Sequence, residues 1–176
     1  MRKLKLSELN RITVEEFKRS PKTPIIIVLD NVRSLYNIGS IFRTADAFRL
    51  ESIYLCGITG TPPNKEIHKS ALGATESVDW KYFENTLDAI NILKENNYNI
   101  IVVEQVEGSS GLEELSFSPS EKIALIFGNE INGVDEKIIC HANKCIEIPQ
   151  FGTKHSLNIS VSVGIVVWEL FRKMHL

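Results

Sequence analysis

A polar stretch at residues 30–47, with the sequence DNVRSLYNIGSIFRTADA, holds side chains that suit phosphate chemistry. Arg43 presents five N–H donors in a planar fork and keeps its charge at working pH. Asn37 offers both a donor and an acceptor. A structural role is the alternative, in which Arg43 pairs with Asp46 or Glu51 and Asn37 caps a helix. The residue types alone leave both interpretations open.

Two further polar loops each follow a short apolar run. The first loop begins with the sequence GNE, and the carboxylate of Glu130 would face a crevice between strands. A tight turn with a solvated glutamate is the alternative. The second loop places Ser156 and Asn158 at the start of an almost entirely apolar helix. Ser156 is a candidate N-cap residue, a role that is compatible with lining a pocket.

These loops must be positioned by strands and helices that alternate along the chain. Expected strands are short apolar or β-branched runs, at residues 25–29, 52–56, 77–80, 98–103, 123–127 and 145–148. Expected helices carry an apolar face, at residues 14–19, 38–48, 65–72, 85–95, 134–141 and from 157 onward. Thr13 and Glu16 have the spacing of a capping box at the first helix, and residues 107–119 are expected to be irregular. The alternation predicts one α/β domain with a mostly parallel sheet flanked by helices. The last helix is apolar around most of its circumference, which indicates a core position or a subunit interface.

The composition is typical of a globular domain: the 176 residues are 43% hydrophobic and 24% charged, and the formal net charge is −2. This charge argues mildly against a protein that coats nucleic acid, so any RNA contact must be local. No apolar run approaches the roughly 20 residues that span a bilayer, and the basic N-terminus lacks the apolar core of a secretory signal. We therefore expect a cytoplasmic protein without membrane contact.

Missing patterns exclude several kinds of site. The three cysteines show no paired spacing, and buried, reduced thiols are expected. The four histidines have no metal-ligand spacing with one another or with the cysteines, so no metal site is predicted. The absence of GxGxxG, of GxxxxGK followed by Ser or Thr, and of GxSxG argues against dinucleotide binding, phosphate-loop hydrolysis and a serine-hydrolase triad.

Three motifs, in order along the chain, resemble the SpoU/TrmH branch of the SPOUT methyltransferases. They are LDNVRSLYNIGSIFRTADAF, IALIFGNEINGV and IEIPQFGTKHSLNISVSVGIVVWE. Enzymes of this family transfer a methyl group from S-adenosyl-L-methionine to a ribose 2′-hydroxyl of RNA. The resemblance implies a deep C-terminal trefoil knot (the SPOUT α/β-knot) and a homodimer with the site near its interface. It divides the chain into an N-terminal extension with a short helix, residues 1–24, and a SpoU-type methyltransferase domain, residues 25–176.

The resemblance also implies roles for individual residues. The catalytic roles fall to Asn37, Arg43, Glu130, Ser156 and Asn158. The cofactor S-adenosyl-L-methionine is expected to contact Phe127, Gly128, Asn129, Ile148, Pro149, Gly152, Ser156 and Leu157. Local cations and the basic N-terminus should bind RNA, and the expected residues are Arg33, Lys65, His68, Lys69 and Lys154.

The expected function is therefore S-adenosyl-L-methionine-dependent methylation of a ribose 2′-hydroxyl of tRNA or rRNA. A non-catalytic knotted RNA-binding module and a base-methylating enzyme of the same fold are the alternatives. The presence of all five catalytic candidates argues against the first, and Arg43, which marks the ribose-modifying branch, argues against the second. Because Arg43 stays protonated, we expect it to bind RNA phosphate and stabilise the alkoxide, with a phosphate or Glu130 as proton acceptor.

Overall fold

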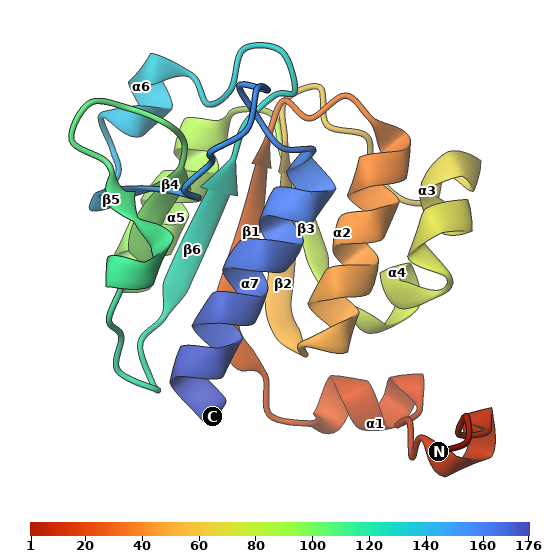
Figure 1. Cartoon of the computed structure of the whole chain (residues 1–176). Coiled ribbons are helices and arrows are strands. Elements are labelled where there is room, and N and C mark those ends of the chain that lie inside the picture. The colour runs from red at the N-terminus through yellow and green to blue at the C-terminus, as the bar shows by residue number, and fades with distance from the viewer.

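Seven parallel strands form one sheet at the centre of the molecule (Figure 1). The computed structural model describes the backbone of residues 1–176 and every side chain except that of Leu6. The strands lie in the order β3-β2-β1-β6-β4-β7-β5, and all neighbouring pairs are parallel. Their bounds are β1 Thr23–Asp30, β2 Leu50–Cys56, β3 Trp80–Phe83, β4 Asn99–Val103, β5 Ser110–Gly111, β6 Ile123–Phe127 and β7 Lys144–Glu147. The predicted mostly parallel sheet is confirmed.

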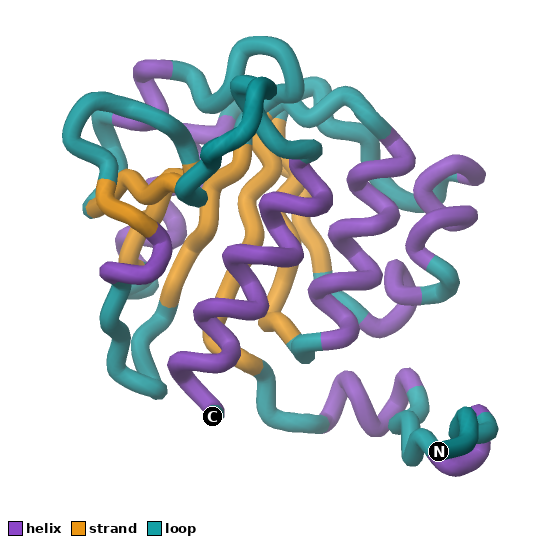
Figure 2. The backbone as a smooth tube through the Cα atoms, in the orientation of Figure 1, coloured by secondary structure: helices purple, strands orange, loops and turns teal.

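Helices cover both faces of the sheet (Figure 2). Helices α2 and α7 lie side by side on one face, with α3 and α4 beyond α2, whereas α5 and α6 pack on the other face. The α-helices are α1 Val14–Arg19, α2 Leu35–Ala47, α3 Lys65–Ala71, α4 Ala74–Ser77, α5 Thr86–Glu95, α6 Glu136–Ile139 and α7 Ile159–His175. Two short 3-10 turns complete the set, η1 Leu6–Glu8 and η2 Leu112–Glu114.

Strand β1 shows why both faces need a cover. Its side chains point alternately to opposite faces. Ile25, Ile27 and Leu29 join the apolar core under α2 and α7, while Ile26 and Val28 join the core under α5. Between its polar end residues the strand is therefore apolar, which is typical of a central parallel strand.

Several elements have the predicted positions. Strand β6 spans the expected residues, and helix α5 starts one residue later than expected. Helix α1 carries the expected capping box: the Thr13 hydroxyl accepts the Glu16 N–H at 3.2 Å, and the Glu16 carboxylate accepts the Thr13 N–H at 2.7 Å. Phe17 buries the inner face of this helix against the body of the protein.

Three predictions about elements are wrong. The strand expected at residues 77–80 starts only at Trp80, because α4 occupies the preceding residues after Leu72 and Gly73 adopt left-handed backbone at φ 51° and 89°. The segment 107–119, expected to be irregular, contains β5 and η2. The helix expected at residues 134–141 is shorter in the structure and forms only α6. The N–H groups of Val134 and Asp135 donate to Glu104 and Asp30 at the ends of neighbouring strands, and these contacts keep the preceding residues out of the helix. Sequence periodicity cannot predict such contacts.

Neither of the two candidate N-cap residues in the polar loops caps its helix. Helix α2 begins at Leu35 and is capped by Ser34, whose hydroxyl accepts the N–H of Asn37 at 3.2 Å. Asn37 lies inside the first turn and is only 7% exposed. Helix α7 is capped by Asn158, which accepts the N–H of Ser160 at 2.9 Å, so Ser156 lies in the loop before the helix.

Helix α7 is buried on one side only. Val163, Val166 and Leu170 are fully buried, but Val161, Ile165 and Trp168 are exposed, Trp168 by 48%. The predicted core position therefore holds for one side of the helix, whereas an apolar stripe faces outward on the other side, where the alternative of a subunit interface stays a prediction.

The remaining predictions concern the burial of the cysteines, metal-binding sites and membrane-spanning segments. The expectation of buried cysteines holds for Cys56, whereas Cys140 is exposed because it caps the short surface helix α6. The described side chains contain no cluster of His, Cys, Asp and Glu that could hold a metal ion. Within the described chain, no helix combines the length and the apolar character needed to cross a membrane.

Candidate active site

The carboxyl ends of β4, β6 and β7 lie at one edge of the sheet, and the loops that follow them surround a pocket of about 540 Å³. This is the edge at which an open parallel sheet forms its ligand crevice. The lining includes apolar, carboxylate and amide side chains, among them Glu104, Phe127, Gly128, Asn129, Glu130, Glu147, Ile148, Gln150, His155, Ser156, Leu157 and Asn158.

Glu130 joins the loop after β6 to the loop after β1. One carboxylate oxygen accepts the backbone N–H of Arg33 at 3.0 Å, and the other accepts the N–H of Ser34 at 3.0 Å. The Asn37 side-chain amide donates to the same carboxylate at 3.4 Å. These contacts are possible because β1 and β6 are neighbours in the sheet. Glu130 therefore fixes the entry of α2 against the pocket.

The pKa of Glu130 lies below its ordinary value. Partial burial acts in the opposite direction and raises the pKa, but the N–H donors of Arg33, Glu130 itself and Ser34, together with the Asn37 amide, outweigh it. The carboxylate is therefore ionised at neutral pH, and its oxygens already accept hydrogen bonds. Both properties make Glu130 a weak proton acceptor.

Asn37 connects Glu130 to the start of α7. Its side-chain oxygen accepts a hydrogen bond from the amide of Asn158 at 3.2 Å. The Asn158 oxygen in turn accepts the N–H and the hydroxyl of Ser160, at 2.9 and 2.7 Å. Three of the five predicted catalytic residues thus form one hydrogen-bonded chain, from the first turn of α7 through the first turn of α2 to the loop after β6.

The loop after β6 is also closed on itself. Asn129 and Gly133 exchange two backbone hydrogen bonds of 2.9 Å, and the Asn129 side-chain oxygen accepts the N–H of Ile131 at 2.9 Å. A Cβ at position 128 would lie 2.1 Å from the carbonyl carbon of Gly133, so only glycine fits there. The Asn129 amide donates to the carbonyl of Asn31 at 2.7 Å, which gives a second bond between the two loops.

Asn31 can accept that bond because its backbone is left-handed, at φ 57°. Asparagine tolerates this conformation better than most residues. Its side chain is held on both ends: the amide donates to Asp30 at 2.9 Å, and the oxygen accepts the N–H of Ile58 at 3.2 Å. Asp30 is only 2% exposed and also accepts the hydroxyl of Thr86 at 2.5 Å. The loop after β1 is thus fixed before any ligand binds.

The structure brings most of the predicted cofactor residues together. The pocket is lined by Phe127, Gly128, Asn129, Ile148, Ser156 and Leu157. Pro149 and Gly152 belong to the same loop but do not line the pocket. Ser156 and Leu157 are exposed at its rim.

Arg43 does not line this pocket. It is six residues beyond Asn37 on α2, which places it about 240° further around the helix. Its side chain lines a separate hollow between α2 and α3, together with Lys69. Within a single chain, the predicted catalytic residues therefore fall into two groups.

The predicted RNA-binding residues are all exposed but scattered. Arg33 lies beside the pocket, three others lie on α3, and Lys154 lies in the loop before α7. On α3, Lys69 pairs with Glu66 at 2.8 Å. The ion pair is exposed and leaves the lysine accessible.

Sequence reasoning missed the contribution of β4. Glu104 follows this strand and lines the pocket, and its carboxylate accepts the N–H of Val134 at 3.0 Å. Gln105 and Glu147 also lie in the lining. The rule that ligands bind at strand carboxyl ends could have identified these residues, because each of them ends or follows a predicted strand.

Comparison with known proteins identifies relatives over nearly the whole chain. Residues 24–168 match the model of the SpoU rRNA Methylase family. An uncharacterized tRNA/rRNA methyltransferase of Borreliella burgdorferi is 32% identical over 93% of this chain and 70% of its own length. The 23S rRNA (guanosine-2′-O-)-methyltransferase RlmB of Neisseria meningitidis is 30% identical over 93% of this chain, which spans 65% of that protein.

Solved structures show the same fold. The AdoMet-bound rRNA methyltransferase of Sinorhizobium meliloti superposes with a TM-score of 0.81 at 28% identity, over 89% of this chain and 58% of that one. The three motif loops that build the pocket all lie inside the matched range. The chain belongs to the SpoU rRNA methylase family.

Proposed function

We propose that this protein transfers a methyl group from S-adenosyl-L-methionine to a ribose 2′-hydroxyl of tRNA or rRNA in the cytoplasm. The observation that carries the proposal is the hydrogen-bonded chain Asn158–Asn37–Glu130 at the pocket. It joins the three motifs that define the resemblance to the family. The Neisseria meningitidis relative is named a guanosine 2′-O-methyltransferase, which supports ribose as the target.

The pocket fits this cofactor. Its volume of about 540 Å³ is within the range of small-molecule sites. Phe127, Ile148 and Leu157 offer apolar surface to an adenine ring. The charged lining residues apart from His155 are acidic, which suits the sulfonium and ammonium groups. When bound, the cofactor supplies a methyl group on sulfur that is open to in-line attack by an oxygen.

The protein's own residues then align the reactants and manage charge. Arg43 binds the RNA backbone and stabilises the negative charge that develops on the 2′-oxygen. Glu130 holds the loops at fixed distances, which is the origin of the alignment. Because Glu130 is committed to N–H donors and has a lowered pKa, an RNA phosphate is the better proton acceptor.

The separation of Arg43 from the pocket supports a homodimer. Val161, Ile165 and Trp168 recur at helical spacing on the outer side of α7, and this apolar stripe needs a partner. A second copy would cover the stripe and could bring Arg43 of one protomer to the pocket of the other. Light scattering tests this: Trp168→Glu should halve the molar mass, and an unchanged mass would place the interface elsewhere.

The path of the chain supports the trefoil knot. Strand β7 lies between β4 and β5, and the following residues must return past the loop after β6 to reach α7 on the face covered by α2. Residues from both loops line the same pocket, so they pass close to each other. We propose that this crossing is the knot and that it shapes the cofactor site.

Nucleoside mass spectrometry tests the reaction. The protein is incubated with S-adenosyl-L-methionine and undermodified total RNA, in parallel with Arg43→Ala and with Lys94→Ala, a surface lysine on α5 as control. We expect a 2′-O-methylnucleoside with wild type and Lys94→Ala but not with Arg43→Ala. A base-methylated product would identify the base-modifying alternative. Cofactor binding without any product would identify the non-catalytic module.

A further inference from the structure

The hollow between α2 and α3 has the chemistry of a nucleotide site. Its volume is about 400 Å³, and its lining has hydroxyl groups, two aromatic rings, two cations and two aliphatic side chains but no acidic side chain. The polar, charged and tyrosine residues of the lining come from α2 and α3, and they are Tyr36, Ser40, Arg43, Thr44, Lys69 and Ser70. Ala47, Phe48 and Leu72 complete it.

Arg43 is free to bind an external anion. Among the described side chains, none forms an ion pair or hydrogen bond with its guanidinium group. Lys69 lies across the hollow on α3 and is engaged only by the exposed pair with Glu66. An exposed ion pair of this kind contributes little free energy, so a contact between Lys69 and a phosphate group can readily replace it. The planar guanidinium group of Arg43 can therefore donate two hydrogen bonds to a phosphate group, and the Lys69 ammonium group adds a compact positive charge.

Tyr36 adds a stacking surface beside these cations. Its side chain is 68% exposed, unusual for so large an apolar ring. Seven residues separate Tyr36 from Arg43, which places both on one side of α2. The hydroxyls of Ser40 and Ser70 both donate to the Tyr36 carbonyl at 3.0 Å, so the backbone beneath the ring is fixed from two helices. An exposed ring on a firmly held backbone, next to cations, is how single-stranded RNA is bound.

Tyr36 also lies next to the proposed catalytic network. The following residue is Asn37, which hydrogen-bonds Glu130 and Asn158. One turn of α2 thus presents a stacking ring to the hollow, and its Asn37 amide contacts two residues that line the pocket. A nucleotide on Tyr36 would be a neighbour of the ribose at the pocket.

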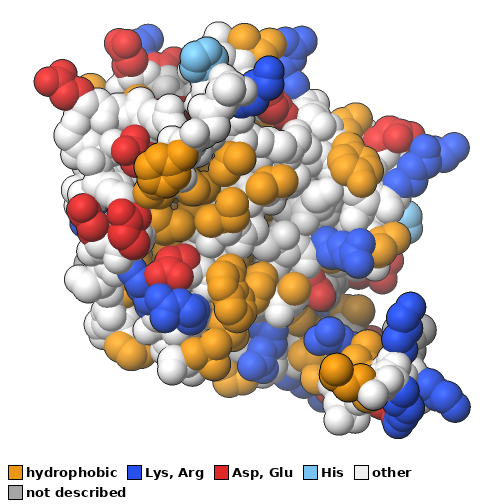
Figure 3. All heavy atoms as spheres, in the orientation of Figure 1, with side chains coloured by type: hydrophobic (Ala, Val, Ile, Leu, Met, Phe, Trp, Pro, Cys, Tyr) orange, Lys and Arg blue, Asp and Glu red, His pale blue; other side chains and the backbone are white. Residues whose placement is uncertain are grey.

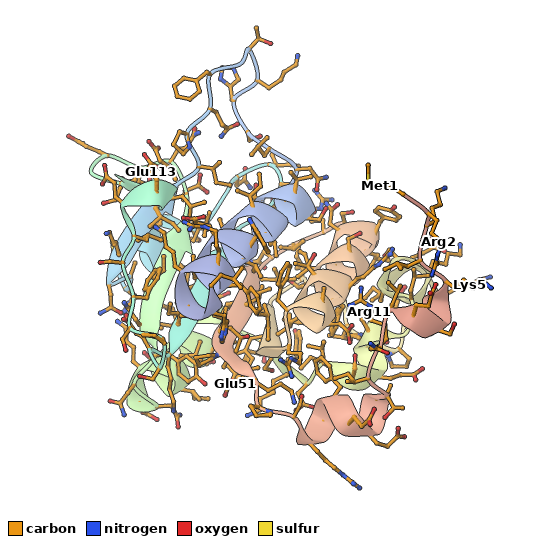
Figure 4. All side chains as sticks on the ribbon, turned by 60° about the horizontal axis from the view of Figure 1, so that its bottom comes forward. Met1, Arg2, Lys5, Arg11, Glu51 and Glu113 are labelled. Carbon is orange, nitrogen blue, oxygen red and sulfur yellow. The ribbon has the colours of Figure 1, made fainter. Side chains whose placement is uncertain are left out.

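The charge distribution of the molecule supports RNA on this side. Residues 1–24 contain seven Lys and Arg against three Glu, although the whole chain has a net charge of −2. Figure 3 shows many Lys and Arg side chains on the side of α2, α3 and the N-terminal segment, with a few acidic ones among them, and mostly Asp and Glu on the opposite side, next to one basic cluster. Figure 4 shows Arg2, Lys5 and Arg11 on the N-terminal segment at one side of the molecule, and Glu113 at the opposite side. A phosphate chain is attracted to the first side.

We propose that this hollow binds an unpaired RNA nucleotide adjacent to the methylated one, with its base on the Tyr36 ring and its phosphate on Arg43 and Lys69. The inference rests on the proposed function, because RNA is the substrate there. It assigns a nucleotide subsite outside the cofactor pocket and a recognition role to Tyr36.

Measuring RNA affinity at several salt concentrations distinguishes stacking on Tyr36 from the charge contact of Lys69. The probe is a single-stranded RNA of about 12 nucleotides, within the site sizes of single-strand binders. Tyr36→Leu should weaken binding about 5- to 150-fold at every salt concentration, because it removes stacking and no charge. Lys69→Gln should instead reduce the slope of log K against log salt by about 0.7. Tyr36→Phe should bind like wild type.

The matched control is Tyr82→Leu, which removes an exposed ring from the edge strand β3. It should leave RNA affinity unchanged. Equal affinity of Tyr36→Leu and wild type would overturn the subsite, and so would a monomeric Tyr36→Leu protein, since the ring would then belong to a subunit interface. Thermal unfolding of Tyr36→Leu and Tyr36→Phe confirms that both remain folded.

The assay also distinguishes this inference from the proposed function. If wild type methylates undermodified RNA but Tyr36→Leu binds the probe equally well, the subsite fails and the function stands. If wild type binds the probe through Tyr36 but yields no 2′-O-methylnucleoside, the function fails and the subsite stands.

Discussion

The pocket at the strand ends and the hollow between α2 and α3 differ in charge and in how their side chains are held. The pocket is lined by Glu104, Glu130 and Glu147, and the hollow by Arg43 and Lys69. The first suits a cationic cofactor and the second an anionic RNA backbone. The two regions therefore present charge of opposite sign, one to the cofactor and the other to the RNA backbone.

The two regions also differ in rigidity. In the pocket, the Glu130 carboxylate is held by backbone N–H groups of another loop, and Asn129 is bonded at both ends of its side chain. In the hollow, the cations are exposed and weakly engaged. A small cofactor of fixed shape requires preorganised walls, whereas flexible single-stranded RNA is met by adaptable side chains. The predictions below test this division.

The largest effect is expected from Glu130→Gln. The new amide would place a donor against the N–H of Arg33 or Ser34, so one of these bonds is lost and the loops move apart. Turnover should fall about 10²-fold, because small misplacements of reacting groups have effects of this size. RNA affinity should stay within about twofold of wild type. An equal loss in RNA affinity would show that the pocket and the hollow are not separate.

A smaller loss is expected from Asn129→Asp. The substitution keeps the acceptor for Ile131 but replaces the donor to the Asn31 carbonyl by an oxygen. Cofactor affinity should fall about 10-fold, since a buried carbonyl loses its partner. Isothermal titration with S-adenosyl-L-methionine measures this. Asn91→Asp, the same change at an exposed position on α5 outside the pocket, is the control and should bind normally. Equal behaviour of the two variants would contradict the cross-loop role.

The hollow is tested by Lys69→Glu. This change places an acid beside Arg43, so RNA affinity should fall about fivefold or more at low salt, and the difference should shrink as salt rises. Cofactor affinity should not change, because Lys69 does not line the pocket. A loss of cofactor binding would refute the separation of the two sites.

The smallest effect concerns acid stability. Because the folded pKa of Glu130 is lowered, its ionised form stabilises the protein above the ordinary glutamate pKa of about 4.3, and this contribution is lost as pH falls through the lowered folded pKa. Urea unfolding of wild type and Glu130→Gln should therefore differ at pH 7 and converge toward pH 3. A difference that persists in acid would assign the stabilisation to packing and not to the charge.

Much of the fold could be predicted because it depends on residues close together in sequence. The apolar run of β6 and the Thr13–Glu16 capping box are local patterns, and both are confirmed. The sequence does not identify the caps of α2 and α7 among neighbouring polar residues, because Ser34 and Asn37, or Ser156 and Asn158, have similar intrinsic capping strength. The choice between them depends on how the loop enters the helix.

By itself, the sequence determined the alternation of strands and helices, the family motifs and the residue types available at the strand ends. Only the tertiary structure decided their pairing. Glu130 binds backbone N–H groups, which every non-proline residue carries, so no side-chain pattern marks Arg33 and Ser34 as its partners. The strand order places β1 beside β6 and thereby makes that contact, and the pitch of α2 turns Arg43 away from Asn37 toward α3.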